Sequence, residues 1–399
     1  MLIDAPKSGR PPTARLAIVI SHPIQYYSPW FRWLAAAGWN LRVFYLWDFG
    51  IVPRTDREFG RPLTWDVDLL SGYEHEFMPN RAAQPGTHHL RGLDNPTLPD
   101  RLRAWQPDVV LLFGYKYLTH LRLIFGARYP LVFRGDSHLL DAPNLAFAKR
   151  WLLGLIYGRF AAVTYVGRAN RAYFRALGVA ETRLVHAPHA VDAAHFTATP
   201  ERRAQAARLR TDLGLDGHRV LLFAGKLIPK KQPLELLEAF LAAGQPGTAL
   251  VFVGDGQERA ALETLAATRP DRSVRFLPFA NQSEMPVRYL LADVFVLPSR
   301  GPEETWGLAV NEAMHLGVPC LVSDRVGCQQ DLVTEGETGW VFSAHEPGAL
   351  AAALGRVLAT DPTALARIRD NGAQRIAGYT YATAAAGLAE AVTVALARR

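Results

Sequence analysis

The amino-acid sequence predicts an α/β protein built from two parallel-sheet domains. Its 399 residues exceed an ordinary single domain and suit two domains of about 150–200 residues each. Hydrophobic residues make up 49% of the chain and charged residues 20%, a composition typical of globular proteins with buried cores. Short apolar runs recur along the chain, each followed by a turn and then by helical periodicity. This is the pattern of parallel strands joined by crossover helices.

The predicted strands fall into two sets, one in each half of the chain. The first set is Leu16–Ile20, Leu41–Leu46, Val109–Phe113, Leu131–Phe133, Ala162–Val166 and Leu184–Ala187. The second set is Val220–Ala224, Ala249–Val253, Val274–Leu277, Val294–Leu297, Pro319–Ser323 and Gly339–Phe342. The polar stretch between the sets predicts a connection near residue 195 and hence domains over residues 1–195 and 196–378. The alanine-rich end, residues 379–399, predicts a helix that packs back on the first domain.

Cysteine content and apolar run lengths narrow the class of protein. Cys320 and Cys328 are the only cysteines, so we expect neither a disulfide framework nor a thiolate metal site. The first apolar run, Leu16–Ile20, is too short for a signal peptide or a membrane span. The sequence therefore predicts a cytoplasmic protein.

The positive charge lies in the first half. The net charge is +7, and residues 1–199 hold 23 Lys and Arg against 15 Asp and Glu, which leaves a balance of −1 for the rest. A basic half attracts the phosphates of a nucleic acid, an anionic membrane face or a charged substrate. Residues Lys149–Arg175 are both basic and rich in aromatic residues. They predict either a solvated face or a surface that rests on the inner face of the cell membrane.

The strongest motif is a pair of glutamates, Glu304 and Glu312, eight positions apart. Gly307 and Leu308 between them predict the start of an amphipathic helix, whose first amides would present unpaired N–H groups and a positive dipole end to an anion. A carboxylate just before such a helix suits sugar hydroxyls, and one two turns into it suits a ribose diol. The alternative is that both glutamates are solvated surface residues.

Two loops after predicted strands in the second half suit phosphate groups. Gly225 leads into the first, which carries Lys226 and Lys231, and Gly254 opens a Gly-x-Gly turn in the second. Ligands of doubly wound sheets bind beyond the carboxyl ends of the strands, where lysines act as point charges. The third glycine of the dinucleotide fingerprint would fall at Arg259, so nicotinamide binding loses its main support. The alternative for the turn is a tight connection that needs glycine for its geometry.

Taken in this order, the motifs resemble those of the family 4 glycosyltransferases, which have the GT-B fold of two Rossmann-like domains facing a central cleft. The resemblance extends from about Ala162 to Val357. It implies that the enzyme transfers a sugar from a nucleotide-diphosphate sugar with retention of configuration, and that it needs no cofactor. It also implies that Glu304 grips the donor sugar and that the donor is bound by Lys226, Lys231, Gly225, Gly254, Phe279, Thr305, Trp306, Gly307, Leu308 and Glu312.

Three positions depart from the family pattern. The first cation of the loop is usually arginine but here is Lys226, which supplies a point charge without a bidentate fork. The familiar Gly-Phe-Gly is Thr305-Trp306-Gly307, which keeps an aromatic wall. His189 stands where asparagine is common, a difference that the sequence does not interpret. The donor base and the donor sugar therefore stay open.

Loops of the first domain predict the acceptor side. His22, Gln25 and Tyr26 follow the first strand and suit contact with a saccharide or lipid-linked acceptor, although the same segment also reads as a proline-rich structural turn. Residues 47–100 lack any regular period and predict either a large irregular insertion or an acceptor-side loop.

Catalytic residues are expected after the strand Leu131–Phe133. The family often has a histidine or an acid there, near the anomeric side of the donor sugar, and Asp136 or His138 could fill that place, with His138 slightly favoured. Lysines and a helix terminus can stabilise a departing diphosphate without a metal. Closure of the two domains would exclude water.

Two short matches to metal motifs carry less weight. Asp66-Val67-Asp68 matches the metal motif of the other glycosyltransferase fold but lies in the irregular segment, and His186 and His189 lack an acidic or cysteine partner nearby. We therefore expect no metal and no nucleic acid, and a role in bacterial cell-surface polysaccharide or glycoconjugate synthesis. The alternatives are a GT-B-shaped sugar-nucleotide epimerase and a non-catalytic protein that binds nucleotide sugars or nucleic acid.

Overall fold

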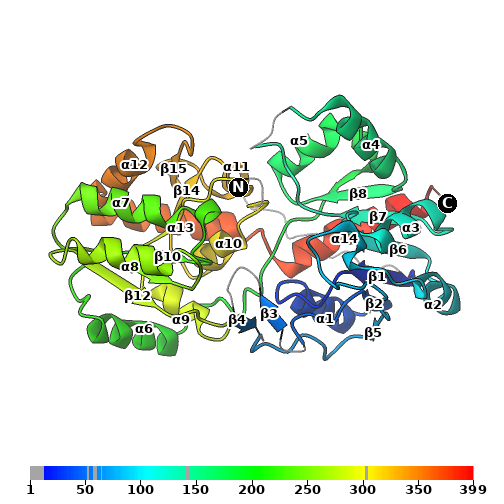
Figure 1. Cartoon of the computed structure of the whole chain (residues 1–399), viewed down its shortest axis with the longest axis horizontal. Helices are drawn as coiled ribbons and strands as arrows, with labels where there is room; N and C mark the ends of the chain where they lie inside the picture. Colours follow the sequence, from blue (N-terminus) through cyan, green and yellow to red (C-terminus); the bar gives the residue numbers. More distant parts are fainter. Residues whose placement is uncertain are drawn as a thin grey trace.

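Two parallel sheets, one in each lobe, form the framework of the protein (Figure 1). The structure is a computed structural model that describes residues 13–51, 54–56, 61–63, 65–140, 144–301 and 304–398. All twelve predicted strands are present, and their ends differ from the prediction by at most one residue. The α/β class and the two-sheet arrangement are thereby confirmed.

The first sheet has seven strands in the order β5-β2-β1-β6-β7-β8-β9, all parallel. The strands are β1 Leu16–Ile20, β2 Leu41–Tyr45, β5 His75–Phe77, β6 Val109–Phe113, β7 Leu131–Arg134, β8 Ala162–Tyr165 and β9 Leu184–His186. Helices α1 Ser28–Ala36, α2 Leu98–Trp105, α3 Leu118–Gly126, α4 Phe147–Gly158 and α5 Arg168–Ala176, with the short η1 Leu90–Gly92 and η2 Glu181–Arg183, lie between them. The small antiparallel pair β3 Arg54–Asp56 and β4 Arg61–Leu63 belongs to the segment predicted as irregular.

The second sheet has six parallel strands in the order β12-β11-β10-β13-β14-β15. The strands are β10 Arg219–Ala224, β11 Thr248–Val253, β12 Ser273–Leu277, β13 Val294–Leu297, β14 Cys320–Ser323 and β15 Gly339–Phe342. The helices of this half are α6 Pro200–Asp212, η3 Pro229–Lys231, α7 Pro233–Ala243, α8 Arg259–Ala267, α9 Met285–Leu290, α10 Leu308–His315, α11 Gln329–Leu332, α12 Ala349–Ala359 and α13 Pro362–Ile376.

Both faces of each sheet are buried, as parallel sheets require. Along β10, Val220, Leu222 and Ala224 join the core on one face, whereas Leu221 and Phe223 join the core on the other. Successive side chains of a strand point to opposite faces, so these continuous apolar runs supply two cores at once. The strand ends are thereby fixed, and the loops that follow them are held at one edge of the sheet.

The last helix, α14 Tyr381–Leu396, returns to the first sheet, where it packs mainly against β8 and β9 and also contacts β6 and β7 (Figure 1). Ala384, Leu388 and Val392 are buried in the core of that sheet. Gly387 sits against β9, because a Cβ there would lie 2.0 Å from the carbonyl oxygen of His186. The chain thus crosses between the lobes twice. The domain limits at residues 195 and 378 stay predictions.

Candidate active site

A cavity of about 460 Å³ lies between the two sheets and is lined by residues of both. Loops that follow parallel strands meet at the carboxyl edge of each sheet, and ligands of open α/β sheets bind there. The cavity brings together fourteen of the residues predicted from the sequence, which are Gln25, Tyr26, Asp136, Gly225, Lys226, Lys231, Gly254, Phe279, Glu304, Thr305, Trp306, Gly307, Leu308 and Glu312. Their roles toward a ligand stay predictions.

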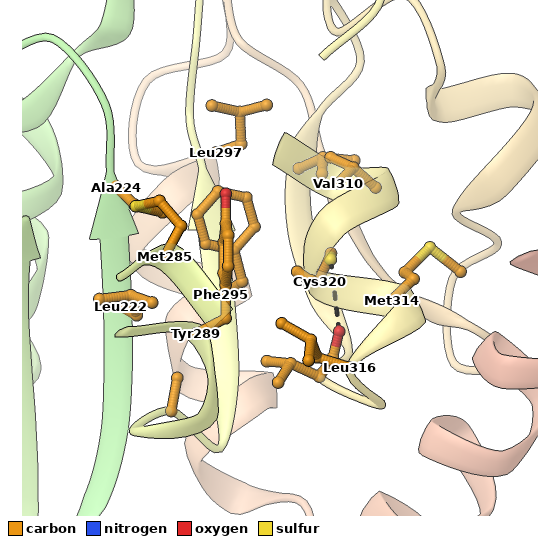
Figure 2. Packing of buried hydrophobic residues seen from close by; sticks show 14 of the residues in the cluster. Leu222, Ala224, Met285, Tyr289, Phe295, Leu297, Val310, Met314, Leu316 and Cys320 are labelled. Carbon is orange, nitrogen blue, oxygen red and sulfur yellow. Dashed lines mark hydrogen bonds between the residues drawn. The ribbon is translucent and has the colours of Figure 1, made fainter. Parts of the chain in front are cut away.

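Helix α10 places Glu312 deep in the cavity wall. The helix begins after Gly307, whose φ of 95° is in the left-handed region that favours glycine. Val310 and Met314 of this helix are buried in the same core as Tyr289 of helix α9 (Figure 2). This packing fixes the direction in which Glu312 points.

The carboxyl of Glu312 is buried, and one of its oxygens can accept a hydrogen bond from a ligand. Its side chain is 2% exposed, and the hydroxyl of Tyr289 donates to Oε2 at 2.7 Å. Oε1 has no hydrogen-bond partner among the residues that the structure describes. Burial raises the pKa of Glu312 to about 7, although the neighbouring hydroxyls of Tyr289 and Tyr26 oppose the shift. A buried, unpaired acceptor is costly, so this oxygen is suited to a hydroxyl of a ligand.

Glu304 lies at the opposite end of the loop before α10 and is held by two donors. Lys231, at the end of η3, forms an ion pair with Oε2, and the Ser299 hydroxyl donates to the same oxygen at 2.8 Å. The side chains of Lys231 and Glu304 are 21% and 12% exposed. The predicted cation and carboxylate therefore meet in the cavity wall, where they can act together on a ligand.

Two glycine turns bring the loops after β10 and β11 into contact. Gly254 has a φ of 142°, and a Cβ there would lie 1.9 Å from the carbonyl oxygen of Gly225. A side chain at this position would push the loop that carries Lys226 away from its neighbour. Glycine is needed here for close approach of two backbones, which agrees with the geometric interpretation of the turn.

The side chain of Trp306 packs at the joint between the two lobes. Its indole is 3% exposed, and Nε1 donates to the Asn311 side chain at 2.8 Å. The ring lies 5.6 Å from the ring of His189 and 6.2 Å from that of Tyr379, centroid to centroid. A Cβ on Gly167, just before α5, would lie 2.5 Å from the indole. The indole thus fills the space between the two lobes.

The structure separates the two candidates that follow β7. Asp136 lines the cavity and accepts from the Thr305 hydroxyl at 2.8 Å and from His189 Nε2 at 3.2 Å. Burial acts to raise the pKa of Asp136, but the bonds and charge of His189 and the bond from Thr305 lower it to about 2. His138 instead places Nε2 3.3 Å from the backbone oxygen of Glu304. Asp136 therefore faces the cavity, and His138 contacts the backbone of the opposite lobe.

The three predicted acceptor-side residues occupy two environments. Gln25 and Tyr26 line the cavity. His22 does not line it, and its ring packs edge-on 5.4 Å from that of Phe49, which does. Burial lowers the pKa of His22 to about 4, so this ring is neutral at physiological pH and suits a supporting position.

The residues of the two short metal-motif matches contact other parts of the protein. Asp66 accepts from the backbone N–H and hydroxyl of Ser283 in the opposite lobe. His189 pairs with Asp136, and His186 lies at the end of β9 with its ring 5.1 Å from that of Tyr165. Among the described residues, no group of three or more histidine, cysteine, aspartate or glutamate side chains could hold a metal ion.

Sequence reasoning missed several residues of this site. Tyr289 and Ser299 bond to the two glutamates, and Phe49 and Trp65 bring part of the irregular segment to the cavity wall. Trp65 lies 6.3 Å from Phe279, ring centroid to centroid. Tyr289 and Ser299 both lie close to the predicted strand Val294–Leu297, one on each side of it. Phe49 and Trp65 are brought to the cavity wall by the fold.

Fold and cavity define a two-domain α/β protein with a ligand site between its sheets, and comparison with known proteins gives the family. Residues 206–375 match the family model described as "Glycosyl transferases group 1". The chain is 31% identical over 344 residues to a D-inositol 3-phosphate glycosyltransferase of Nocardia farcinica, a match that covers 77% of this chain and 74% of that protein. The chain belongs to the group 1 glycosyl transferases.

Other relatives match over less of their length, and solved structures match in fold. The chain is 33% identical over 211 residues to a GDP-mannose-dependent α-(1-6)-phosphatidylinositol monomannoside mannosyltransferase of Mycolicibacterium smegmatis, of which it spans about half (53%). The structure of Anabaena Alr3699/HepE in complex with UDP and glucose superposes with a TM-score of 0.70 at 18% identity, over 95% of this chain and 99% of that one. The fold is GT-B, as the motifs implied.

Within the described ranges, no helix is both long enough and apolar enough to cross a bilayer.

Proposed function

We propose that this protein is a retaining, family 4 glycosyltransferase that moves a sugar from a nucleotide-diphosphate sugar to a saccharide or lipid-linked acceptor. The observation that carries the proposal is the unpaired Oε1 of the buried Glu312, which lines the same cavity as the Lys231–Glu304 ion pair and the first turn of α10. A ribose hydroxyl needs a hydrogen-bond acceptor, a diphosphate needs a positive field, and a sugar needs a polar carboxylate. Bacterial cell-surface polysaccharide or glycoconjugate synthesis is the setting that we propose for the reaction.

In the proposed reaction, the bond between the anomeric carbon and the diphosphate oxygen breaks, and a bond from the same carbon to an acceptor oxygen forms. Lys226, Lys231 and the first amides of α10 would stabilise the negative charge of the departing diphosphate, which is chemistry that they can supply without a metal. The acceptor hydroxyl would give its proton to the departing phosphate. Glu304 and Asp136 would contact the sugar.

A panel of nucleotide sugars tests this proposal. Release of a nucleoside diphosphate that depends on an added saccharide or lipid-linked acceptor would support transfer. An isomerised donor would favour a sugar-nucleotide epimerase instead, and binding without turnover would favour a non-catalytic binding protein. The configuration of the product, read from the NMR coupling of its anomeric proton, tests retention.

We also propose that helix α4 contacts an anionic membrane beside the acceptor. Four apolar side chains of this helix are exposed, with Phe147 at 84%, Trp151 at 60%, Leu152 at 51% and Leu155 at 47%. Residues 142–180 contain no aspartate or glutamate but six lysines and arginines. Apolar and aromatic side chains next to cations are what a helix needs to lie in the headgroup region of an anionic bilayer.

Within the basic, aromatic stretch, α4 supports the proposed membrane contact better than α5 does. The aromatic side chains of α5, Tyr173 and Phe174, are buried, and its Arg171 and Arg175 form ion pairs with Glu181. The exposed Lys149 and Arg150 lie on α4 itself. We therefore assign the membrane contact to α4 rather than to the whole stretch.

Co-sedimentation with lipid vesicles tests this contact. The protein should sediment with phosphatidylglycerol vesicles and much less with phosphatidylcholine vesicles, and the double variant Trp151→Ala/Leu155→Ala should lose about tenfold or more in partitioning. Trp33→Ala, which changes an exposed tryptophan (37%) on α1, is the matched control. Equal binding to both lipids would show that the membrane contact is not electrostatic. A double variant that binds like the parent would show that α4 does not make the contact.

A further inference from the structure

The loop after β7 is tied to the opposite lobe through one carboxylate. Oδ2 of Asp136 accepts from the Thr305 hydroxyl at 2.8 Å and from His189 Nε2 at 3.2 Å. Asp136 lies in the loop after β7, Thr305 in the loop before α10 (here the donor loop, residues 304–307), and His189 in the connection between the lobes. The Asp136 side chain keeps 35% of its surface exposed and lines the cavity. Its position thus depends on both lobes at once.

His189 is built into the joint and has little freedom to turn. Its side chain is 3% exposed, with its ring 5.6 Å from that of Trp306 and 6.0 Å from that of Tyr27, centroid to centroid. Its carbonyl oxygen accepts from the Asn311 side chain at 3.3 Å, and Asn311 also accepts from Trp306 Nε1. Ring and backbone are therefore both anchored to the second lobe, so that Nε2 points at Asp136.

Charge considerations fix the direction of the hydrogen bond. Burial lowers the pKa of His189, although Asp136 opposes the shift, and the pKa of Asp136 is about 2. At neutral pH the imidazole therefore faces an ionised carboxylate. Since the carboxylate can only accept, the proton of the imidazole lies on Nε2, and His189 is the donor.

We propose that His189 is a positioning residue for sugar transfer: together with Thr305 it holds the Asp136 carboxylate against the donor loop. This inference rests on the proposed function. The nucleoside and diphosphate contacts proposed above come from Glu312, Lys231 and the first amides of α10, none of which bonds to the imidazole of His189. His189 should therefore matter for turnover of the sugar and little for binding of the nucleotide.

A pair of matched substitutions tests the donor role. His189→Gln keeps an N–H donor at a similar reach, whereas His189→Met keeps the length and removes the donor. We expect the methionine variant to lose about tenfold or more in kcat and the glutamine variant to stay within about threefold of the parent. Both should bind UDP or GDP, whichever the parent binds, with unchanged affinity in calorimetry.

A second pair avoids the risk that a change in the buried joint unfolds the protein. Thr305→Val removes the other donor to Asp136, and Thr305→Ser keeps it. In the combined variants, His189→Met should add little to Asp136→Asn, because both act through the same carboxylate. Equal loss in the glutamine and methionine variants, equal loss in the valine and serine variants, or additive losses with Asp136→Asn would each overturn the role of His189. A parent chain that turns over no nucleotide sugar would instead overturn the proposed function.

Discussion

Glu312→Gln should remove a specific pH dependence from the stability of the protein. The pKa of Glu312 is raised by burial from its usual 4.5 to about 7 in the folded chain. Between these two values the folded state keeps a proton that the unfolded state has lost. Stability must therefore fall as the pH rises from about 4.5 to 7.

The magnitude follows from the size of the shift. Each unit of pKa difference corresponds to about 1.4 kcal/mol, so the cost of ionising the buried Glu312 carboxyl is about 3 kcal/mol above pH 7. Glutamine cannot ionise, and its amide oxygen can still accept from the Tyr289 hydroxyl. The variant should therefore gain about 3 kcal/mol over the parent between pH 4.5 and pH 8.

Urea denaturation at pH 5, 6, 7 and 8 measures this difference. Glu238→Gln, which changes an exposed residue of α7, is the control. Its free energy of unfolding should differ from that of the parent by the same amount at every pH. Parent and Glu312→Gln stability profiles that run parallel across this pH range would contradict the prediction, because they would show that the Glu312 carboxyl titrates alike in the folded and unfolded chains.

Three further substitutions test the cavity wall. Lys231→Ala should lower donor affinity about tenfold or more, because roughly 1.5–3 kcal/mol of charge-assisted hydrogen bonding is lost. Unchanged affinity in calorimetry would contradict the role of Lys231 in donor binding. Glu304→Gln should abolish most of the turnover while the melting temperature stays within a few degrees, and parent-level activity would show that the donor sugar is placed wrongly. Gly254→Ala should cost roughly 2 kcal/mol or more of stability, since its Cβ would meet the oxygen of Gly225, whereas Gly178→Ala, also at positive φ but with nothing within 4 Å, should cost clearly less. Equal thermal shifts of the two glycine variants would argue against the close contact.

The fold could be predicted from local pattern because each strand carries its own signal. Runs such as Val109–Phe113 are continuously apolar, and a parallel strand buried on both faces needs that composition. Among the strands that were not predicted, His75–Phe77 is a three-residue strand at the edge of the first sheet and has no apolar run. Its pairing with β2 depends on the neighbouring strand rather than on its own sequence.

The second-lobe wall of the site could also be predicted, since its residues follow strand ends or open a helix. Contacts across the lobes could not. His189 was an uninterpreted departure from the family pattern, because its partner Asp136 lies 53 positions away. The hydrogen bond of Tyr289 to Glu312 was likewise invisible, because only the packing of α9 against α10 brings the two together.

The most direct test of the account is the release of nucleoside diphosphate from a panel of UDP-, GDP-, ADP- and dTDP-sugars, with and without saccharide or lipid-linked acceptors. We expect at least one donor to be consumed only when an acceptor is present, and we expect Glu304→Gln to lose this activity while remaining folded. Consumption of no donor with any acceptor, or conversion of a donor to its epimer without release of nucleoside diphosphate, would contradict this expectation.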